Sequence, residues 1–413
     1  MTQLTANFHV MAKPVGPICN LECQYCYYLE KEKLFPKGEN FRMKPEVLEA
    51  YIQQYIASQQ TEEVTFAWQG GEPTLLGVDY FREIVALQHR HADGRKINNT
   101  LQTNGTLLDA EWCRFFSEHG FLIGLSIDGP RELHDAHRVD RGGKPTFDRV
   151  RHGLALLKEH QVEFNTLTVI SATNGAHPLA VYEFLREIGS GYIQFIPLVE
   201  RLPSSEASAA GLDFAEPPGP DQPELAVTPW SVPPLVFGKF LTTIFDQWVR
   251  RDVGQVFVQM FDVSLGIWAG FGPGLCLFLP DCGEALALEH NGDLYSCDHF
   301  VYPKYKLGNV MNESITALVN SATQQNFGKA KSRTLPNYCR QCEVRYACNG
   351  ECPKHRFLTT PDGEPGLNYL CAGYRRFFNH VDPYMRTMTK LLRARKAPAG
   401  IMDMLRQQAE GSA

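Results

Sequence analysis

Three cysteines near the start of the chain have the spacing of a metal site. Cys19, Cys23 and Cys26 are separated by three and two residues. Soft thiolates bind both iron–sulfur clusters and zinc. Three cysteines on a four-iron cluster leave one iron free to bind a small molecule, whereas a structural zinc site needs a fourth ligand that is missing nearby. The spacing therefore favours an iron–sulfur cluster over zinc.

Eight more cysteines lie in the second half of the chain. Eight thiolates make two sets of four, enough to complete two further four-iron clusters or two structural zinc sites. A twelfth cysteine, Cys113, stands apart in a predicted helix and is interpreted as a buried apolar residue. The eight grouped cysteines are Cys276, Cys282, Cys297, Cys339, Cys342, Cys348, Cys352 and Cys371.

The composition limits the class of protein. The 413 residues, of which 44% are hydrophobic and 21% charged, predict a large globular domain and a smaller one. The net charge of −6 and the lack of a long basic run argue against nucleic acid as a partner. No apolar run reaches the roughly 18 residues of a membrane span, and the N-terminus lacks the pattern of a signal peptide. We therefore expect a cytoplasmic protein, in which clustered cysteines bind metal rather than form disulfides.

Short apolar runs alternate with amphipathic stretches from about residue 8 to 200. The predicted strands are Phe8–Lys13, Glu63–Trp68, Ile97–Gln102, Leu122–Ile127, Phe164–Ile170 and Tyr192–Pro197. The predicted helices are Pro45–Ser58, Val78–His91, Asp109–His119, Thr146–His160 and His177–Ile188. This alternation predicts a parallel sheet, and six units are too few for a closed eight-stranded barrel. We predict an α/β fold, an open partial (β/α)6 barrel with its site at the C-terminal ends of the strands.

The second half of the chain is organised differently. Residues 201–235 contain eight prolines and are predicted to form an irregular connection, followed by a helix over Pro234–Arg251 with Ser231 near its cap. From about 270 to 375 the periodicity is weak, which is typical of a small domain held by metal rather than by a core. We therefore predict a barrel over 1–235, a linker helix and metal domain over 236–382, and a polar helical tail over 383–413.

The N-terminal motif resembles that of the radical S-adenosylmethionine (SAM) superfamily. Its form is Cys-x3-Cys-x2-Cys with an aromatic residue, Tyr25, before the last cysteine. The resemblance implies that the open iron binds the amino and carboxylate groups of SAM. Reduction of the cluster then cleaves SAM and produces a 5′-deoxyadenosyl radical.

Other short motifs resemble the SAM-contacting strand ends of that superfamily. They are Gly70-Gly71-Glu72-Pro73, Asn104 in Gln-Thr-Asn-Gly, Ser126 in Ser-Ile-Asp-Gly-Pro, and Arg138, which could pair with the SAM carboxylate. Taken alone, the glycines could serve an ordinary turn and Arg138 could be a surface residue. Tyr28 and Val199 fall where the family contacts adenine. The resemblance thus implies a SAM site made by Tyr28, Gly70, Gly71, Glu72, Asn104, Ser126, Arg138 and Val199.

The late cysteines resemble the SPASM domain, a module that carries auxiliary clusters in peptide-modifying radical SAM enzymes. In that family, the ligands of the two auxiliary clusters are interleaved along the sequence. Together with the N-terminal cluster, three [4Fe–4S] clusters are expected. Cys276, Cys282, Cys297 and Cys352 would hold the cluster nearer the site, and Cys339, Cys342, Cys348 and Cys371 the outer one. Two zinc sites remain the alternative on sequence chemistry alone.

Asp298 directly follows the third of these cysteines, where the family has a proposed base. A partly desolvated carboxylate with its pKa raised toward neutrality could take the proton that the substrate loses. The alternatives for Asp298 are a helix cap or a hydrogen bond to a cluster ligand. His299 is a weaker candidate for the base.

The whole chain, outside residues 201–235, resembles the anaerobic sulfatase-maturating enzymes. These oxidise a Cys or Ser of a sulfatase to Cα-formylglycine, and the resemblance implies a sulfatase polypeptide as substrate and a flavodoxin or ferredoxin as electron donor. We expect a monomer, and Gln69 is predicted to contact the substrate. The rival interpretations are another SPASM-type maturase, forming thioether or carbon–carbon crosslinks, and a non-catalytic iron–sulfur partner protein. No residue distinguishes a Cys-type from a Ser-type substrate.

Overall fold

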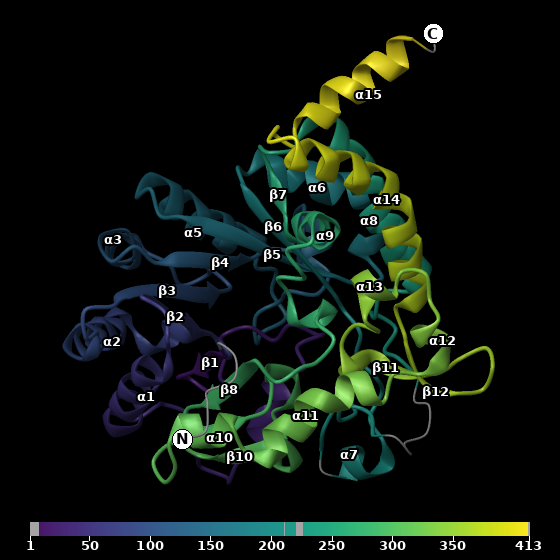
Figure 1. Cartoon of the computed structure of the whole chain (residues 1–413). Coiled ribbons are helices and arrows are strands. Elements are labelled where there is room, and N and C mark those ends of the chain that lie inside the picture. Colours follow the sequence, from purple (N-terminus) through teal and green to yellow (C-terminus); the bar gives the residue numbers. More distant parts are fainter. Residues whose placement is uncertain (1–7, 210, 220–225, 412–413) are drawn as a thin grey trace.

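One open sheet of ten strands runs through the described part of the chain (Figure 1). The computed structural model describes residues 8–209, 211–219 and 226–411. In chain order the strands are β1 (His9–Lys13), β2 (Glu63–Trp68), β3 (Lys96–Thr103), β4 (Leu122–Ser126), β5 (Phe164–Ile170), β6 (Tyr192–Pro197), β7 (Phe257–Val258), β8 (Ala285–Glu289), β9 (Asp293–Tyr295) and β10 (Lys306–Asn309). The order across the sheet is β10-β9-β8-β1-β2-β3-β4-β5-β6-β7, so the sheet has two edges and does not close.

Strands β1 to β6 are parallel and are joined by helices, as the alternating pattern predicts. The helices are α1 (Pro45–Ser58), α2 (Val78–His91), α3 (Ala110–Glu118), α4 (Arg131–Asp135), α5 (Phe147–Glu159) and α6 (Pro178–Glu187). Their starts have local causes. Pro45 occupies the first turn of α1, and the Asp109 carboxylate accepts a hydrogen bond from the Trp112 N–H to cap α3. The partial (β/α)6 barrel is confirmed.

The C-terminal region extends the same sheet. Strand β8 pairs in parallel with β1, and β9 and β10 continue it in antiparallel order. Leu286, Leu288 and Leu294 are buried in one cluster with Val10 and Trp68 of the barrel. The expectation that metal rather than a core holds this region was therefore wrong for residues 285–318, because strand pairing supplies a hydrophobic core that the weak periodicity did not reveal.

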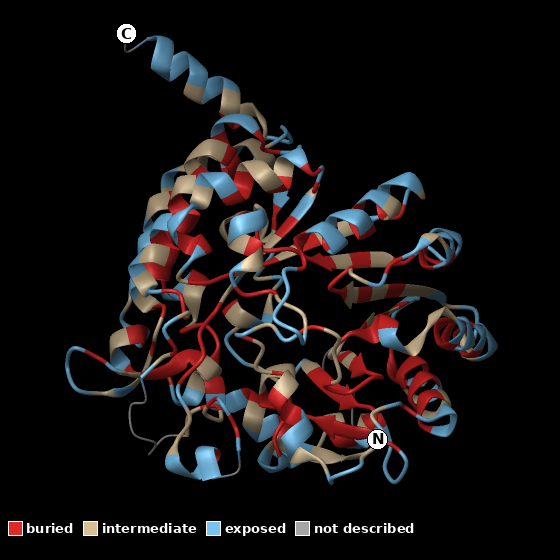
Figure 2. Ribbon diagram, turned by 180° about the vertical axis from the view of Figure 1, so that it is seen from behind, coloured by how far each residue is buried: buried red, intermediate tan, exposed pale blue. Residues whose placement is uncertain are grey.

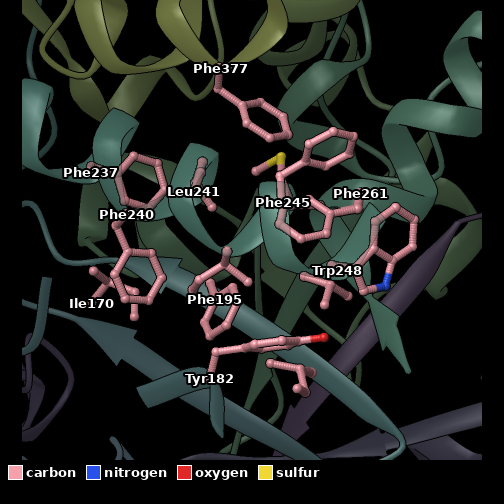
Figure 3. Close-up of a cluster of buried hydrophobic side chains, with 14 of the residues drawn as sticks. Ile170, Tyr182, Phe195, Phe237, Phe240, Leu241, Phe245, Trp248, Phe261 and Phe377 are labelled. Carbon is pink, nitrogen blue, oxygen red and sulfur yellow. The ribbon is translucent and has the colours of Figure 1, made fainter. Parts of the chain in front are cut away.

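A second core lies between the sheet and three helices, α8 (Pro234–Arg251), α9 (Gln259–Ala269) and α14 (Cys371–Arg393). Figure 3 shows Phe245 and Trp248 of α8 beside Phe261 of α9, with Phe377 of α14 above them and Phe195 of β6 below. These aromatic side chains join the barrel, the linker helix and the C-terminal helix in one packed unit.

One predicted boundary was wrong. Pro383 lies inside α14, so the C-terminal helix starts well before residue 383, because the helix packs on α8 along its length. The predicted bounds of α8 are confirmed; its N-cap is Pro233, and Ser231, predicted near the cap, accepts a hydrogen bond from the Glu200 N–H at 3.0 Å.

The remaining elements are short. They are α7 (Ser205–Ala209), α10 (Ile315–Val319), α11 (Ala322–Arg333), α12 (Asn337–Arg340), α13 (Arg345–Cys348), β11 (Arg356–Thr359), β12 (Pro365–Asn368) and α15 (Gly400–Glu410). Short 3-10 helices cover Leu29–Leu34, Pro73–Leu76, Asn174–Ala176, Cys276–Phe278, Asp298–Phe300, Pro303–Tyr305 and Pro353–His355. Apart from α7, the described part of 201–235 is irregular, as predicted, and part of it lies outside the described residues. Figure 2 shows that α15 is largely exposed and projects from the body. Within the described ranges, no helix has the length and apolarity to cross a bilayer.

Candidate active site

The C-terminal ends of the barrel strands surround a cavity of about 280 Å³. This is the position at which barrels of this kind carry their chemistry. The cavity is closed on one side by the loop after β1 and on the other by the C-terminal region. Its predicted site residues are Cys19, Cys23, Cys26, Tyr28, Gly70, Gly71, Asn104, Ser126, Arg138 and Asp298. The structure therefore brings together residues from the ends of four strands, β1 to β4, and from a segment far along the chain.

The loop with the first three cysteines is held against the two glycines after β2. The Gly71 N–H donates to the Gly16 carbonyl at 2.8 Å, and the Glu72 N–H donates to the Ile18 carbonyl at 2.9 Å. A Cβ atom at Gly71 would lie 1.9 Å from the Ile18 oxygen. Glycine is therefore required here, because any side chain would push the cysteine loop away. The Cys19 and Cys23 thiols are buried, which raises the pKa of each to about 12 in the metal-free protein.

The Glu72 side chain does not face the cavity. It is fully buried, and its carboxylate accepts hydrogen bonds from the Thr74 N–H and hydroxyl, from the Thr103 hydroxyl and from the Asn104 N–H, at 2.6 to 3.0 Å. The predicted SAM contact of this motif is made through backbone carbonyls and stays a prediction, since the Glu72 side chain is engaged elsewhere. Its carboxylate instead ties the Gly70-Gly71 turn to the end of β3.

Asn104 and Ser126 lie where the sequence predicts them. The Asn104 amide nitrogen is 3.7 Å from the Cys19 sulfur and donates to the Asn20 side chain at 2.9 Å. Ser126, at the end of β4, lines the same cavity. These polar groups lie beside the cysteine loop and can receive a polar ligand there.

Arg138 reaches the cavity as part of an ion pair. Its guanidinium contacts both oxygens of Asp128, with Nε–Oδ2 at 2.8 Å and Nη2–Oδ1 at 3.2 Å. Burial opposes the charge, but Asp128 raises the pKa of Arg138 well above its usual value. Tyr25 and the Val169 N–H also donate to Asp128. The alternative interpretation of Arg138 as an ordinary surface arginine is excluded, since the residue is buried.

The two predicted adenine contacts differ in outcome. Tyr28 lines the cavity, with its hydroxyl bonded to Glu289 and its ring 4.0 Å from the Lys13 ammonium. Val199 does not: it is buried in the core between the barrel and α8. Leu198, one residue earlier, lines the cavity instead. A register difference of one residue along an extended chain reverses the direction of the side chain, and sequence alone did not fix that register.

Asp298 forms the opposite wall of the cavity. One carboxylate oxygen lies 2.5 Å from the Lys13 ammonium, and the other accepts a hydrogen bond from the Tyr27 hydroxyl at 2.7 Å. Burial favours the neutral acid, but Lys13 and these polar contacts outweigh it and lower the pKa of Asp298 to about 2. The expectation of a raised pKa was wrong, because the sequence did not reveal the cation opposite. Burial and the nearby Lys354 lower the pKa of His299 to about 3.

The eight late cysteines fall into two groups. Burial raises the pKa of every thiol. Where one of these cysteines influences the pKa of another, the two belong to the same set: Cys276, Cys282, Cys297 and Cys352 in one, and Cys339, Cys342, Cys348 and Cys371 in the other. These are the two interleaved sets that the resemblance implies. Among the described residues, no three His, Cys, Asp or Glu side chains are grouped so as to hold a metal ion. Two sets of four cysteines are the ligand number that two four-iron clusters need.

Sequence reasoning missed several residues of the cavity. Lys13 ends β1 and is only 2% exposed. The one feature of the sequence that could have indicated it is the position of a lysine at the end of an apolar strand. Lys354 pairs with Glu200 at 2.5 Å and lies over the Tyr27 ring. Gln69, the predicted substrate contact, also lines the cavity. No local pattern marks Glu200 or Lys354, since each depends on a partner far along the chain.

The comparisons with known proteins agree with this geometry. Residues 14–185 match the model of the radical SAM superfamily, and residues 280–343 match that of an iron–sulfur cluster-binding domain, SPASM. A serine-type anaerobic sulfatase-maturating enzyme of Bacteroides thetaiotaomicron is 48% identical over 96% of this chain and 95% of its own. A cysteine-type enzyme of Clostridium perfringens is 31% identical over 91% of this chain and 96% of its own. A solved structure, native anSMEcpe with bound AdoMet and Cp18Cys peptide, has a TM-score of 0.80 at 30% identity and covers 93% of this chain and 99% of that chain.

The open barrel, the cysteine loop and the C-terminal cysteine domain are those of a radical SAM enzyme whose cofactors are [4Fe–4S] clusters and SAM. The sequence identity to the two relatives extends over nearly the whole chain, so a specific family within this class can be assigned. The chain belongs to the family of anaerobic sulfatase-maturating enzymes.

Proposed function

We propose that this chain oxidises a serine of a sulfatase polypeptide to Cα-formylglycine. The observation that carries the proposal is the arrangement of one cavity, with the three-cysteine loop on one wall and Asp298, next to Cys297, on the other. A substrate side chain between the two walls can lose a hydrogen atom on one side and a proton on the other.

The cofactor ligands follow from the same arrangement. Cys19, Cys23 and Cys26 would hold the first cluster, with Gly70, Gly71, Asn104, Ser126 and Arg138 around SAM and Tyr28 and Leu198 beside the adenine. The two sets of four cysteines would hold the auxiliary clusters. When bound, these groups supply the 5′-deoxyadenosyl radical that removes a hydrogen atom and the acceptor for the electron left behind.

The protein residues perform the proton transfer. Asp298 accepts the hydroxyl proton of the substrate, since it is the ionised carboxylate that faces the cavity; its ion pair with Lys13 makes it a weaker base than the raised pKa expected from the sequence would. Lys13 and Tyr27 hold the two carboxylate oxygens in place. Lys354 and Glu200 line the cavity near Tyr27 and are available to orient the polypeptide.

Serine as the target rests on the relatives. The serine-type enzyme of Bacteroides thetaiotaomicron is 48% identical, whereas the cysteine-type enzyme of Clostridium perfringens is 31% identical, each over more than nine-tenths of this chain. We also infer that the enzyme works in the cytoplasm as a monomer with a small electron-transfer protein as donor. Reduced thiols, which cluster assembly needs, persist in that compartment.

The test uses paired peptides that contain the sulfatase motif with Ser or Cys at the target position. The reconstituted, reduced enzyme with SAM should convert the Ser peptide with loss of two hydrogen atoms, and the product should react with a hydrazide probe for aldehydes. A crosslinking maturase would give the same mass loss but no hydrazide adduct. Asp298→Asn should remove the product. Faster conversion of the Cys peptide than the Ser peptide would contradict the serine assignment.

A further inference from the structure

Arginines are concentrated in the two segments that carry three of the four outer cysteines. The segments 333–346 and 371–379, which carry Cys339, Cys342 and Cys371, contain five arginines and one glutamate, although the chain as a whole has a net charge of −6. All five arginines are exposed. We call them the arginine surface: Arg333, Arg340, Arg345, Arg375 and Arg376.

Most of this charge is not neutralised by the protein. Arg375 pairs with Glu343 at 2.8 Å, and Arg340 donates to backbone carbonyls, including that of Leu335 at 2.8 Å. Among the described residues, Arg333 and Arg376 form no ion pair with an acidic side chain, and neither does Arg345. Three guanidinium groups therefore remain free for an anionic partner.

The arginine surface also contains a hollow that reaches the cysteine set. A cavity of about 540 Å³ is lined by Cys371 itself, with Tyr338, Arg375, Arg376 and Asn379. A molecule seated in this hollow would thus contact a ligand of the outer cluster, with arginines on its rim.

We propose that the arginine surface is the docking site of an acidic one-electron carrier protein. The inference rests on the proposed function, which removes one hydrogen atom and one proton from the substrate and leaves one electron to be exported. The auxiliary clusters, held by the two sets of four cysteines, would take up that one electron, and an oxidised carrier protein would accept it in a one-electron reduction. Complementary charge speeds such encounters and orients them.

A competing explanation is that the arginines only balance the negative charge of a cluster with four thiolates. The distribution of contacts argues against it for Arg333 and Arg376. Both are exposed, and within the described residues neither donates a hydrogen bond to a cysteine. The two explanations also predict different binding results.

The test measures binding of an acidic flavodoxin to the cluster-loaded enzyme by anaerobic calorimetry. The variant Arg333→Glu/Arg345→Glu/Arg376→Glu reverses three charges without touching the cysteines. The control Arg114→Glu/Arg151→Glu/Lys158→Glu reverses three exposed charges that lack an ion pair among the described residues, on α3 and α5, on the opposite side of the molecule in Figure 1. Iron content and absorption spectra show whether either variant has lost its clusters.

We expect flavodoxin to bind the wild type at low ionic strength, to dissociate as salt is added, and to bind the first variant at least about tenfold more weakly. The control should bind like the wild type. Equal affinity of the first variant and the wild type would overturn the proposal, as would equal weakening in the control. Single-turnover conversion of the Ser peptide is measured separately, so a missing formylglycine product would contradict the proposed function and leave the docking result independent.

Discussion

The ammonium nitrogen of Lys13 lies 2.5 Å from a carboxylate oxygen of Asp298, with the two side chains 2% and 18% exposed. Lys13 closes the first strand of the barrel, and Asp298 follows a cysteine of the C-terminal region. The pairing of β1 with β8 brings the two segments together, since Lys13 stands opposite Glu289 in that register. The ion pair therefore couples the barrel to the auxiliary domain at the reacting position.

Removal of Lys13 tests this coupling. Lys13→Met should leave the Asp298 carboxylate without its cation, at a cost of about 3 kcal/mol in the free energy of unfolding, and should remove formylglycine formation. The double variant Lys13→Met/Asp298→Asn removes both charges, so it should recover most of the stability and none of the product. Urea unfolding and peptide mass spectrometry measure the two effects. A double variant as unstable as Lys13→Met alone would show that the charge pair is not the cause.

Gly71 is a second point at which geometry makes a clear prediction. In Gly71→Ala, the new Cβ atom would overlap the Ile18 carbonyl and displace the cysteine loop. A displacement of about 1 Å at a reacting centre lowers the rate roughly 100-fold, so we expect a loss of that size in 5′-deoxyadenosine formation. Gly191→Ala is the matched control, because a Cβ atom there would meet no atom within 4 Å. Normal deoxyadenosine formation by Gly71→Ala would rule out this account of the turn.

The sequence predicted the local structure of the barrel well. The bounds of β2, β5 and β6, and of α1, α2 and α8, agree with the prediction residue for residue. Each of these elements has a clear apolar periodicity and a proline, glycine or capping residue near an end. The cysteine sets were also within reach, since their spacing is itself the signal.

Features that depend on pairing between distant segments were not predictable in the same way. The Lys13–Asp298 pair requires the register of β1 on β8, and no local pattern of residues 285–289 reveals that the strand joins the barrel sheet. Leu198 lines the cavity where Val199 was predicted, because the side chains of neighbouring residues in an extended segment point in opposite directions. The buried environment of Glu72 follows from two loops that meet only in the folded chain.

His134 provides a prediction about pH. Its ring is buried, with Nδ1 accepting a hydrogen bond from the Asp128 N–H at 3.3 Å and Nε2 beside the Thr146 hydroxyl at 3.0 Å. Burial and the nearby Arg138 lower the pKa of His134 from 6.5 to about 4. The unfolded chain therefore binds a proton more readily between these values, so the contribution of neutral His134 is present above pH 6.5 and is lost as the pH falls toward 4.

The expected loss at pH 4 is roughly 3 kcal/mol. In His134→Asn, the side-chain oxygen can replace Nδ1 as acceptor but cannot take up a proton, so the unfolding midpoint should depend less on pH in this range. The exposed His152→Gln should leave the pH dependence as in the wild type. Identical pH profiles for His134→Asn and the wild type would refute the assignment.

Cys342 and Cys371 are expected to share one cluster although their segments are separate in the chain. Both thiols interact with each other and with Arg375. The wild type, fully loaded, should contain about twelve irons per chain, and Cys342→Ala/Cys371→Ala should contain about eight. Cleavage of SAM should persist in this variant, since the first three cysteines are intact, whereas repeated turnover should slow because the outer route for the electron is lost.

Cys113→Ala is the matched control for this loss of iron. Cys113 is fully buried among the apolar residues of α3 and belongs to neither set, so its removal should leave about twelve irons. Measurement of zinc in the same samples distinguishes iron–sulfur clusters from zinc sites. A wild type that holds two zinc ions and about four irons would replace the auxiliary clusters by zinc sites, and it would remove the electron acceptor on which the oxidation of the substrate depends.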